Sequence, residues 1–305
     1  MIKSLHIYSV SLCMALGLIN CTDVIVVDIE EVPPQLVIDA WINNKPEAQT
    51  IRLTLTQGYF NNTFAPGVTS AEVIVADESG QLFVFEHQGE GNYVWTPAPG
   101  ETIGDIGSTF FLGVEWNGTT FASQSTLNRV PEVDSIQVEF RANELGFPDG
   151  HYAQFFSRDP LGRGDTYWIK SFKNDLFLNK PFELNIAWDA GFSGGTDSDG
   201  IIFLGPIREA INRVPDPGSE DDSDDNSEVP PWMPGDEIRV EIHSITNLAF
   251  DFLEIARAQM TNGTNTIFAI PLANTRTNII TLDGDEEALG FFCVSAISSR
   301  TTIVE

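Results

Sequence analysis

The chain has 305 residues, 42% of them hydrophobic, and a formal net charge of −28 at pH 7. Charge of this sign repels nucleic acid and anionic lipid headgroups, so nucleic-acid binding is excluded. The hydrophobic fraction, which includes 21 Phe, is sufficient for the core of one large or two ordinary domains.

The first twenty residues have the layout of a secretory signal peptide. Lys3 supplies a positive charge, and residues 5–19 are apolar apart from three polar side chains. This stretch is shorter than the ~20 apolar residues of a transmembrane helix, and no later stretch reaches that length. We therefore expect residues 1–20 to be removed on export.

The signal peptide ends at Leu18-Ile19-Asn20-Cys21, which resembles the lipobox of bacterial lipoproteins. In that motif the cysteine becomes the lipidated first residue, although Asn20 departs from the usual small residue. The alternative is a plain secreted protein that carries Cys21 by chance. After residue 20 only Cys21 and Cys293 remain, so lipidation of Cys21 leaves no disulfide pair.

Residues 21–34 are the expected lipid anchor and acidic tether. Thr22 to Glu31 carries four acidic residues, and Val32-Pro33-Pro34 is typical of a stiff, extended linker. A lipid anchor holds a water-soluble domain at a membrane surface. Acidic residues close behind a lipidated cysteine also resemble the surface-export signals of Bacteroidota lipoproteins. The sequence thus predicts a cell-envelope lipoprotein of the outer membrane, exposed at the cell surface.

Residues 35–130 are predicted to form a β-sandwich of the immunoglobulin or transthyretin kind. In residues 49–57, apolar Ile51 and Leu53 alternate with polar neighbours, as in a half-buried strand. Strands are expected at residues 36–41, 49–57, 71–76, 82–86, 92–95, 109–116 and 120–125. Turn-forming residues separate them, and Asn117-Gly118 is a strong signal for a two-residue hairpin. Seven strands at this spacing are typical of a sandwich.

A second β-rich domain is predicted over residues 131–305. Arg129-Val130-Pro131-Glu132 is the expected boundary, because proline stops a strand and the flanks are polar. Strands are expected at residues 135–141, 152–157, 166–172, 182–188, 201–204, 237–244, 266–270 and 291–298. Residues 247–260 predict one amphipathic helix, with Thr246 or Asn247 as its N-cap.

Residues 215–231 are predicted to be a disordered acidic insertion, because dense like charge between prolines repels itself. Carboxylates here and in a second loop are candidate calcium ligands, since calcium prefers oxygen ligands in flexible loops. The candidates are Asp197, Asp199, Asp221, Asp222, Asp224 and Asp225. No spacing fixes a geometry around a cation, so we assign no metal and no cofactor.

One motif has the form of a catalytic site. Gly191-Phe192-Ser193-Gly194-Gly195 matches the G-x-S-x-G pattern of serine hydrolases, and His243 lies downstream. A nucleophile elbow requires a helix after the turn, whereas residues 196–200 predict a loop. The histidines lack metal-binding spacing, and Cys293 lies in an apolar strand that raises a thiol pKa. We therefore predict that the chain is not an enzyme.

Aromatic residues in loops are candidates for contact with a partner or ligand. Trp232 lies between two proline-containing dipeptides, and Tyr59, Phe60 and Phe64 belong to the loop at residues 58–67. Such side chains can dock partners or stack on ligands. In the alternative, they fold back over the core, since isolated apolar residues at a surface need no partner.

Several short motifs along the mature chain carry a family resemblance. They are Ala71 to Val75 with the turn Asp77 to Gly80, Gly91-Asn92-Tyr93, Arg158 to Gly162 leading into Tyr167-Trp168, Asn278-Ile279-Ile280, the acidic turn Asp283 to Glu287, and Gly290-Phe291-Phe292. Together they resemble the Bacteroidota lipoproteins classed as domain of unknown function 4249. The resemblance implies an envelope lipoprotein, often associated with TonB-dependent outer-membrane receptors, and supplies no catalytic residues.

Three functions are therefore considered. The leading hypothesis is an accessory lipoprotein of a TonB-dependent receptor that helps in nutrient capture or uptake, and it predicts an exposed apolar patch. The second is a structural or adhesive envelope protein without small-molecule capture. The least favoured is a hydrolase that uses Ser193, which requires His243 and a carboxylate within hydrogen-bonding reach.

Overall fold

The computed structural model describes residues 33–58, 60–61, 63–144, 148–213, 230–262, 275–284 and 286–305. From Pro34 to Glu305 the chain forms one compact unit. Its described elements are mostly strands, which confirms the predicted mainly β fold class. The signal peptide, Cys21, most of the tether, nearly all of the acidic insertion and the predicted strand at residues 266–270 lie outside the described residues.

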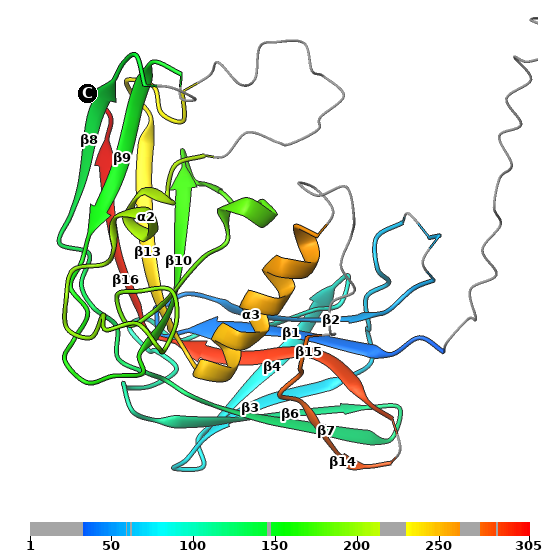
Figure 1. Ribbon diagram of the computed structural model, residues 1–305. Helices are drawn as coiled ribbons and strands as arrows, with labels where there is room; N and C mark the ends of the chain where they lie inside the picture. The colour runs from blue at the N-terminus through cyan, green and yellow to red at the C-terminus, as the bar shows by residue number, and fades with distance from the viewer. Residues whose placement is uncertain are drawn as a thin grey trace, which may run out of the picture. The chain divides into compact units, whose positions relative to one another are not determined.

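Nine strands form the first sheet, in the order β14-β7-β6-β3-β4-β5-β2-β1-β15 (Figure 1). Their bounds are β1 (Leu36–Asn43), β2 (Gln49–Leu55), β3 (Glu72–Asp77), β4 (Leu82–Gly89), β5 (Asn92–Trp95), β6 (Thr109–Trp116), β7 (Thr119–Thr126), β14 (Ile280–Asp283) and β15 (Ala288–Ser295). Neighbours are antiparallel except β1 and β15, which run parallel. The sheet is nearly closed, because β15 meets β7 where Val294 N–H donates to Ser125 Oγ at 3.0 Å. The immunoglobulin or transthyretin sandwich stays a prediction.

The hydrophobic core inside this sheet comes from alternate residues of its strands. On β6, for example, Phe110, Leu112 and Val114 point inward and are buried, as a period of two requires. The turn from β6 to β7 has positive φ at both Asn117 (51°) and Gly118 (79°). A two-residue hairpin of this kind needs positive φ at both positions, so the predicted Asn-Gly hairpin is confirmed.

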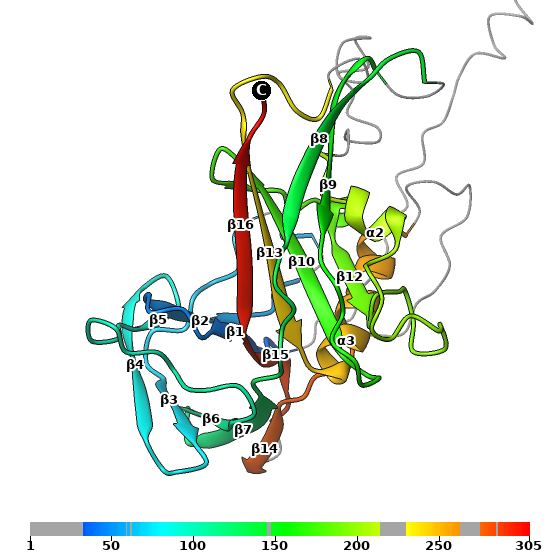
Figure 2. The same ribbon diagram turned by 90° about the vertical axis from the view of Figure 1, so that its left-hand side faces the viewer.

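A second sheet has the order β11-β10-β13-β16, and a further strand, β12, also pairs with β10. The bounds are β10 (Thr166–Lys173), β11 (Leu176–Phe177), β12 (Asn185–Trp188), β13 (Glu237–Ile245) and β16 (Ile297–Ile303). The separate hairpin of β8 (Ser135–Arg141) and β9 (Gly150–Phe156) runs alongside this sheet (Figure 2). Buried residues of the hairpin, of the sheet and of helix α2 (Gly205–Glu209) form one core cluster.

Helix α3 (Asn247–Met260) confirms the predicted helix at both ends. Thr246 is its N-cap, because the hydroxyl accepts a hydrogen bond from Ala249 N–H at 3.2 Å. Phe250 and Leu253 are buried, and they pack in a third cluster that joins α3 to residues of both sheets. No helix among the described residues is long and apolar enough to cross a membrane.

Two predicted strands differ from the structure. Of residues 182–188, only residues 185–188 are a strand, because Pro181–Glu183 forms a 3-10 turn. The strand predicted at residues 201–204 is wrong, since Ile202 makes a single bridge with Arg158 and α2 begins at Gly205. Local apolar composition could not distinguish these short segments from strands.

The C-terminal strands differ from the predicted domain organisation. The strand expected at residues 291–298 is divided by Ala296 between β15 in the first sheet and β16 in the second. β14, which had not been predicted, joins the first sheet beside β7. Strands β14 and β15, which lie in the range expected for the second domain, therefore complete the first sheet, and the boundary after residue 130 does not separate the two sheets along the chain.

Candidate functional site

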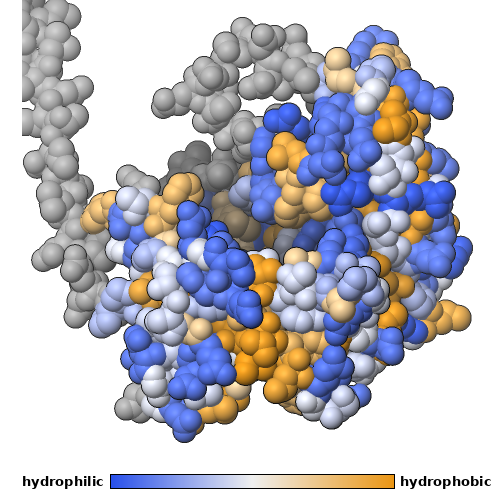
Figure 3. Space-filling model, turned by 180° about the vertical axis from the view of Figure 1, so that it is seen from behind, coloured by the Kyte–Doolittle hydropathy of each residue, from blue (hydrophilic) through white to orange (hydrophobic). Residues whose placement is uncertain are grey.

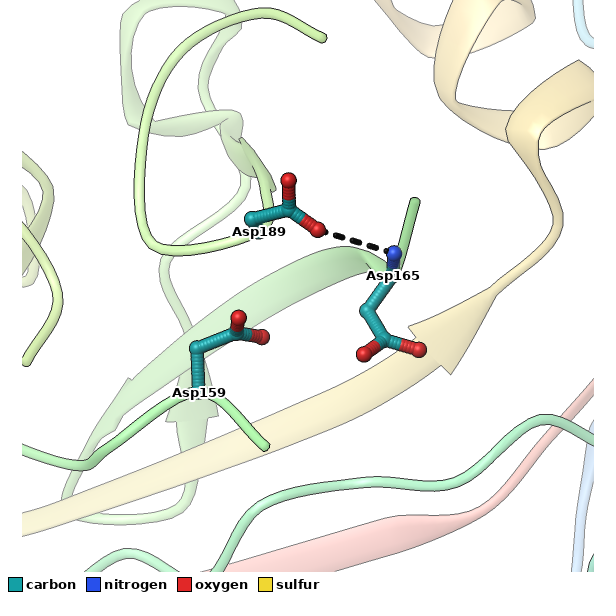
Figure 4. A group of neighbouring side chains, drawn as sticks. All are labelled: Asp159, Asp165 and Asp189. Atoms are coloured by element: carbon teal, nitrogen blue, oxygen red, sulfur yellow. Dashed lines mark hydrogen bonds between the residues drawn. The ribbon is translucent and has the colours of Figure 1, made fainter. Parts of the chain in front are cut away.

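Three aspartates meet where loops converge at one end of the second sheet (Figure 4). Asp159 follows β9, Asp165 precedes β10, and Asp189 follows β12. One carboxylate oxygen from each lies within 4.8 Å of the others. Asp159 and Asp189 are buried, which is unusual for carboxylates without partners.

Each of these carboxylates accepts hydrogen bonds from the protein. Asp159 accepts from the Tyr167 hydroxyl at 2.7 Å and from Gly200 N–H at 3.0 Å. Asp189 accepts from the backbone N–H groups of Gly164 at 2.8 Å and Asp165 at 3.0 Å. The cluster therefore joins two loops that are distant in sequence, residues 157–165 between β9 and β10 and residues 189–204 after β12.

Arg129 neutralises part of this charge. Its guanidinium donates to both carboxylate oxygens of Asp165, with the closest contact at 2.6 Å, and this pairing raises the pKa of Arg129. Burial raises the pKa of Asp159 even though Tyr167 donates to it. Three carboxylates have the oxygen chemistry of a divalent-cation site, but the protein's own donors already engage them. The geometry supports a structural role for the cluster, in which hydrogen bonds hold the loop before β10 against the loop after β12.

The sequence did not single out this cluster, although the loop from Arg158 to Gly162 was part of the family resemblance. Two calcium candidates lie in the same loop as Asp189 and also have partners in the protein. Asp199 accepts from Gly162 N–H at 2.8 Å, and the exposed Asp197 pairs with Arg163 at 2.7 Å. The candidates Asp221, Asp222, Asp224 and Asp225 lie outside the described residues.

Aromatic residues fill the junction of the two sheets and α3. The ring centroid of Trp41 on β1 lies 5.3 Å from that of Trp168 on β10 and 5.6 Å from that of Phe291 on β15. The Lys170 ammonium lies 3.9 Å from the centroid of the Trp168 ring, in the geometry of a cation–π contact. Burial lowers the pKa of Lys170 to about 8, because desolvation disfavours the charged form.

A buried ionic network adjoins this junction. Glu241 on β13 accepts from Lys45 Nζ at 2.8 Å and lies 3.0 Å from His243 Nε2. Burial alone would raise the pKa of Glu241, but hydrogen bonds from His243 and Lys45 outweigh it and lower that pKa to about 2. Burial lowers the pKa of His243 to about 4, so the ring is neutral at pH 7 and donates through Nε2–H.

The proposed serine nucleophile is not assembled with a histidine. Ser193 lies in an exposed loop, where its hydroxyl lies 3.3 Å from that of Thr196. His243 instead pairs with Glu241, and no hydrogen bond among the described residues joins Ser193 to it. The free Cys293 is fully buried, and desolvation raises its pKa as expected.

The aromatic candidates divide between core and surface. Trp232 is 0% exposed, and its indole N–H donates to Asn212 Oδ1 at 2.9 Å. The Trp232 side chain fills the second core and finds its polar partner there, which agrees with the alternative that the loop aromatics fold back over the core rather than with exposure to a partner. Phe60 and Phe64 are exposed, Phe64 to 94%. Tyr59 lies outside the described residues.

Phe64 also lines a groove of ≈ 380 Å³ between the first sheet and α3. Trp41, Phe252 and Phe291 supply its apolar wall, and Asp39 beside Arg52 supplies its charged groups. Burial raises the pKa of Asp39, although Arg52 opposes the shift. Phe64, one of the loop aromatics that the sequence singled out, therefore lines a groove together with three other aromatic residues.

The outward side of strands β4, β3, β6, β7 and β14, which we call the outer face, carries two rows of mainly apolar residues. The register places Val84, Ile74, Gly113, Ala122 and Ile280 in one row across these five strands. A second row runs through Leu82, Ala76 and Phe111. Leu82 is 61% exposed, Phe111 45% and Ile280 59%.

The exposure of this face follows from the fold. On β1 and β15 the outward Trp41 and Phe291 are covered by α3 and β10. No described element covers Val84, Phe111 or Ile280 in the same way, and hydrophobic residues gather in the lower part of the view from behind (Figure 3). Apolar side chains that form a continuous exposed patch are typical of interaction sites.

Comparison with known proteins adds one finding. A family model with the description "Domain of unknown function (DUF4249)" matches residues 22–301, which is nearly the whole chain. The comparison with curated proteins gives no significant match. The chain thus belongs to the DUF4249 family.

Proposed function

We propose that this protein is a lipid-anchored outer-membrane protein that acts by binding, as an accessory of a TonB-dependent receptor in nutrient capture or uptake. The observation that carries the proposal is the outer face. An apolar surface that spans five strands is a liability for a free-standing protein, and a partner that covers it removes the liability. The leading hypothesis from the sequence required such a patch.

Two features support the placement at a membrane. Cys21 closes a lipobox-like sequence, and a lipid chain there supplies the anchor. The family match begins at Thr22, as expected if Cys21 is the first residue of the mature chain. An anchored accessory also needs no catalytic constellation, and Ser193 and His243 have separate partners.

An affinity pull-down of the tagged, full-length protein from detergent-solubilised outer membranes tests the proposal. Wild type should retain a TonB-dependent barrel, identified by mass spectrometry. Cys21→Ser should lose it, whereas Cys13→Ser, which changes a cysteine inside the signal peptide, should retain it. Recovery of no barrel with wild type would favour the structural or adhesive alternative instead.

A further inference from the structure

An acidic row borders the apolar rows of the outer face. Glu72 on β3 lies directly opposite Glu115 on β6, and both side chains are exposed. The row continues through Thr120 on β7 to Asp283 on β14. β4 lies on the other side of β3, and its register pairs Phe85 with Val73. Because the strands are antiparallel, the exposed Glu86 of β4 lies next to Glu72 in the acidic row.

Like charges that are directly opposite on a sheet are destabilising. No ion pair involves Glu72, Glu86 or Glu115 within the part of the chain that the structure describes. The sequence explains this, because residues 53–128 contain no Lys or Arg. Acidic residues in that stretch are Glu72, Asp77, Glu78, Glu86, Glu90, Glu101, Asp105 and Glu115.

We infer that the outer face docks a partner protein whose contact surface is apolar and is bordered on one side by Lys or Arg. This inference rests on the proposed function and specifies the chemistry of the partner. Apolar rows supply the buried centre of the interface, and the acidic row supplies complementary charge at one border. The uncompensated Glu72–Glu115 pair is then a charge that the partner neutralises.

Charge also decides against two other occupants. A second copy of this chain carries the same net charge of −28 and brings no Lys or Arg from residues 53–128. An anionic lipid surface is repelled for the same reason. A basic protein surface remains the complement of the outer face.

A photo-crosslinking amino acid at Phe111, in the full-length lipidated protein made by its own cells, tests the inference. Phe111 is exposed, so its replacement leaves the core intact. The adduct should contain one identified protein, with Lys or Arg flanking the crosslinked peptide. Because like charges at an interface repel, Glu72→Lys with Glu115→Lys should lower the adduct yield at least about tenfold.

Two matched controls belong to the same experiment. The pair Asp251→Lys and Glu254→Lys changes the net charge equally on the exposed side of α3 and should leave the yield within about twofold. The same photo-crosslinker at the exposed Leu248 of α3 should not give the adduct.

The outcomes separate this inference from the proposed function. An adduct with a TonB-dependent barrel that requires Glu72 and Glu115 supports both. An adduct with a different identified basic protein supports the docking face and overturns the receptor assignment. An adduct with a second copy, an adduct insensitive to charge reversal, or no adduct overturns the docking face, and the pull-down then decides the receptor assignment by itself.

Discussion

At the scale of single residues, polar side chains that are buried in the interior have hydrogen-bond or ion-pair partners. His243 is the clearest case, because the residue is 6% exposed and its Nε2 lies 3.0 Å from Glu241 Oε2. The charges facing the ring are those of Glu241 and Lys45 in the network and Lys170 on the neighbouring strand. These contacts make the stability of the protein depend on pH.

We predict that acid destabilises the fold through His243. Its pKa in the folded chain is about 4, below the ordinary 6.5, so the unfolded chain binds a proton first as the pH falls. The free energy of unfolding should therefore decrease between pH 6.5 and 4, by at most roughly 3 kcal/mol from this residue. The lowered pKa of Glu241 adds a further loss below pH 4.5.

Urea denaturation of wild type and His243→Asn at several pH values measures this effect. Asn keeps a donor toward Glu241 but does not titrate, so the variant should lose stability less steeply between pH 6.5 and 4. His87→Asn, at an exposed position on β4, should follow the wild-type slope. Equal slopes for wild type and His243→Asn would contradict the prediction.

Trp232 also tests the structure at this scale. Because the indole is fully buried and donates to Asn212, Trp232→Ala should reduce the free energy of unfolding by about 3–5 kcal/mol. Phe64→Ala should change it by less than about 0.5 kcal/mol, since Phe64 is exposed. Denaturant unfolding measures the free energy of unfolding of both variants. A small effect of Trp232→Ala, similar to that of Phe64→Ala, would mean that Trp232 is exposed and again a candidate for contact with a partner.

At the scale of elements, features with local signals were predictable from the sequence. The Asn117-Gly118 hairpin and the helix from Asn247 to Met260 depend on neighbouring residues alone, and both are confirmed. The pairing of β1 with β15 joins residues about 250 positions apart, and nothing in either segment specifies it. That is why residues 280–295 were expected in a separate domain.

The candidate sites followed the same rule. The outer face could have been recognised in the sequence from three apolar runs. The segments Val73 to Ala76, Phe83 to Phe85 and Phe110 to Val114 are apolar at consecutive positions. Strands of this kind are apolar on both sides. The aspartate cluster had no such signal in the sequence, since Asp189 lies in a different loop from Asp159 and Asp165 and meets them only in the folded chain.

Gly290 tests the pairing of β1 with β15. Its φ is +99°, and a Cβ atom at this position would lie 2.0 Å from the carbonyl oxygen of Ile38. Gly290→Ala should therefore destabilise the protein by at least about 2 kcal/mol. Gly113→Ala on the outer face meets only the Ile74 carbonyl oxygen at 4.0 Å and should be nearly neutral. Thermal unfolding compares them, and a neutral Gly290→Ala would contradict the close approach of the two strands.

At the scale of the whole molecule, the outward side of the first sheet differs between its two parts. Around β1 and β15 it is covered by α3 and the second sheet, with aromatic residues between them. Around β3, β4 and β6 no element among the described residues covers it, and the exposed surface there is apolar with acidic residues along one border. This asymmetry is the basis for the proposed function in binding.

The acidic border should reduce the stability of the free protein. Glu72→Gln removes the repulsion with Glu115, so the free energy of unfolding should increase by about 0.2–1 kcal/mol at low salt. The gain should shrink in 1 M salt, where screening is strong. Asp251→Asn on α3 is the matched control and should show no comparable gain. A loss of stability in Glu72→Gln would mean that an attractive contact had been removed.

The most direct test of the proposed binding through the outer face is to measure how much TonB-dependent barrel each of three tagged proteins recovers. These are wild type, a double variant with Val84→Ser and Phe111→Ser, and a control with Leu248→Ser on α3. All three positions are exposed, so stability should be preserved and can be verified by unfolding. We predict that wild type and the control retain a TonB-dependent barrel and that the double variant loses it. Equal recovery by all three, or recovery by none, would contradict the account.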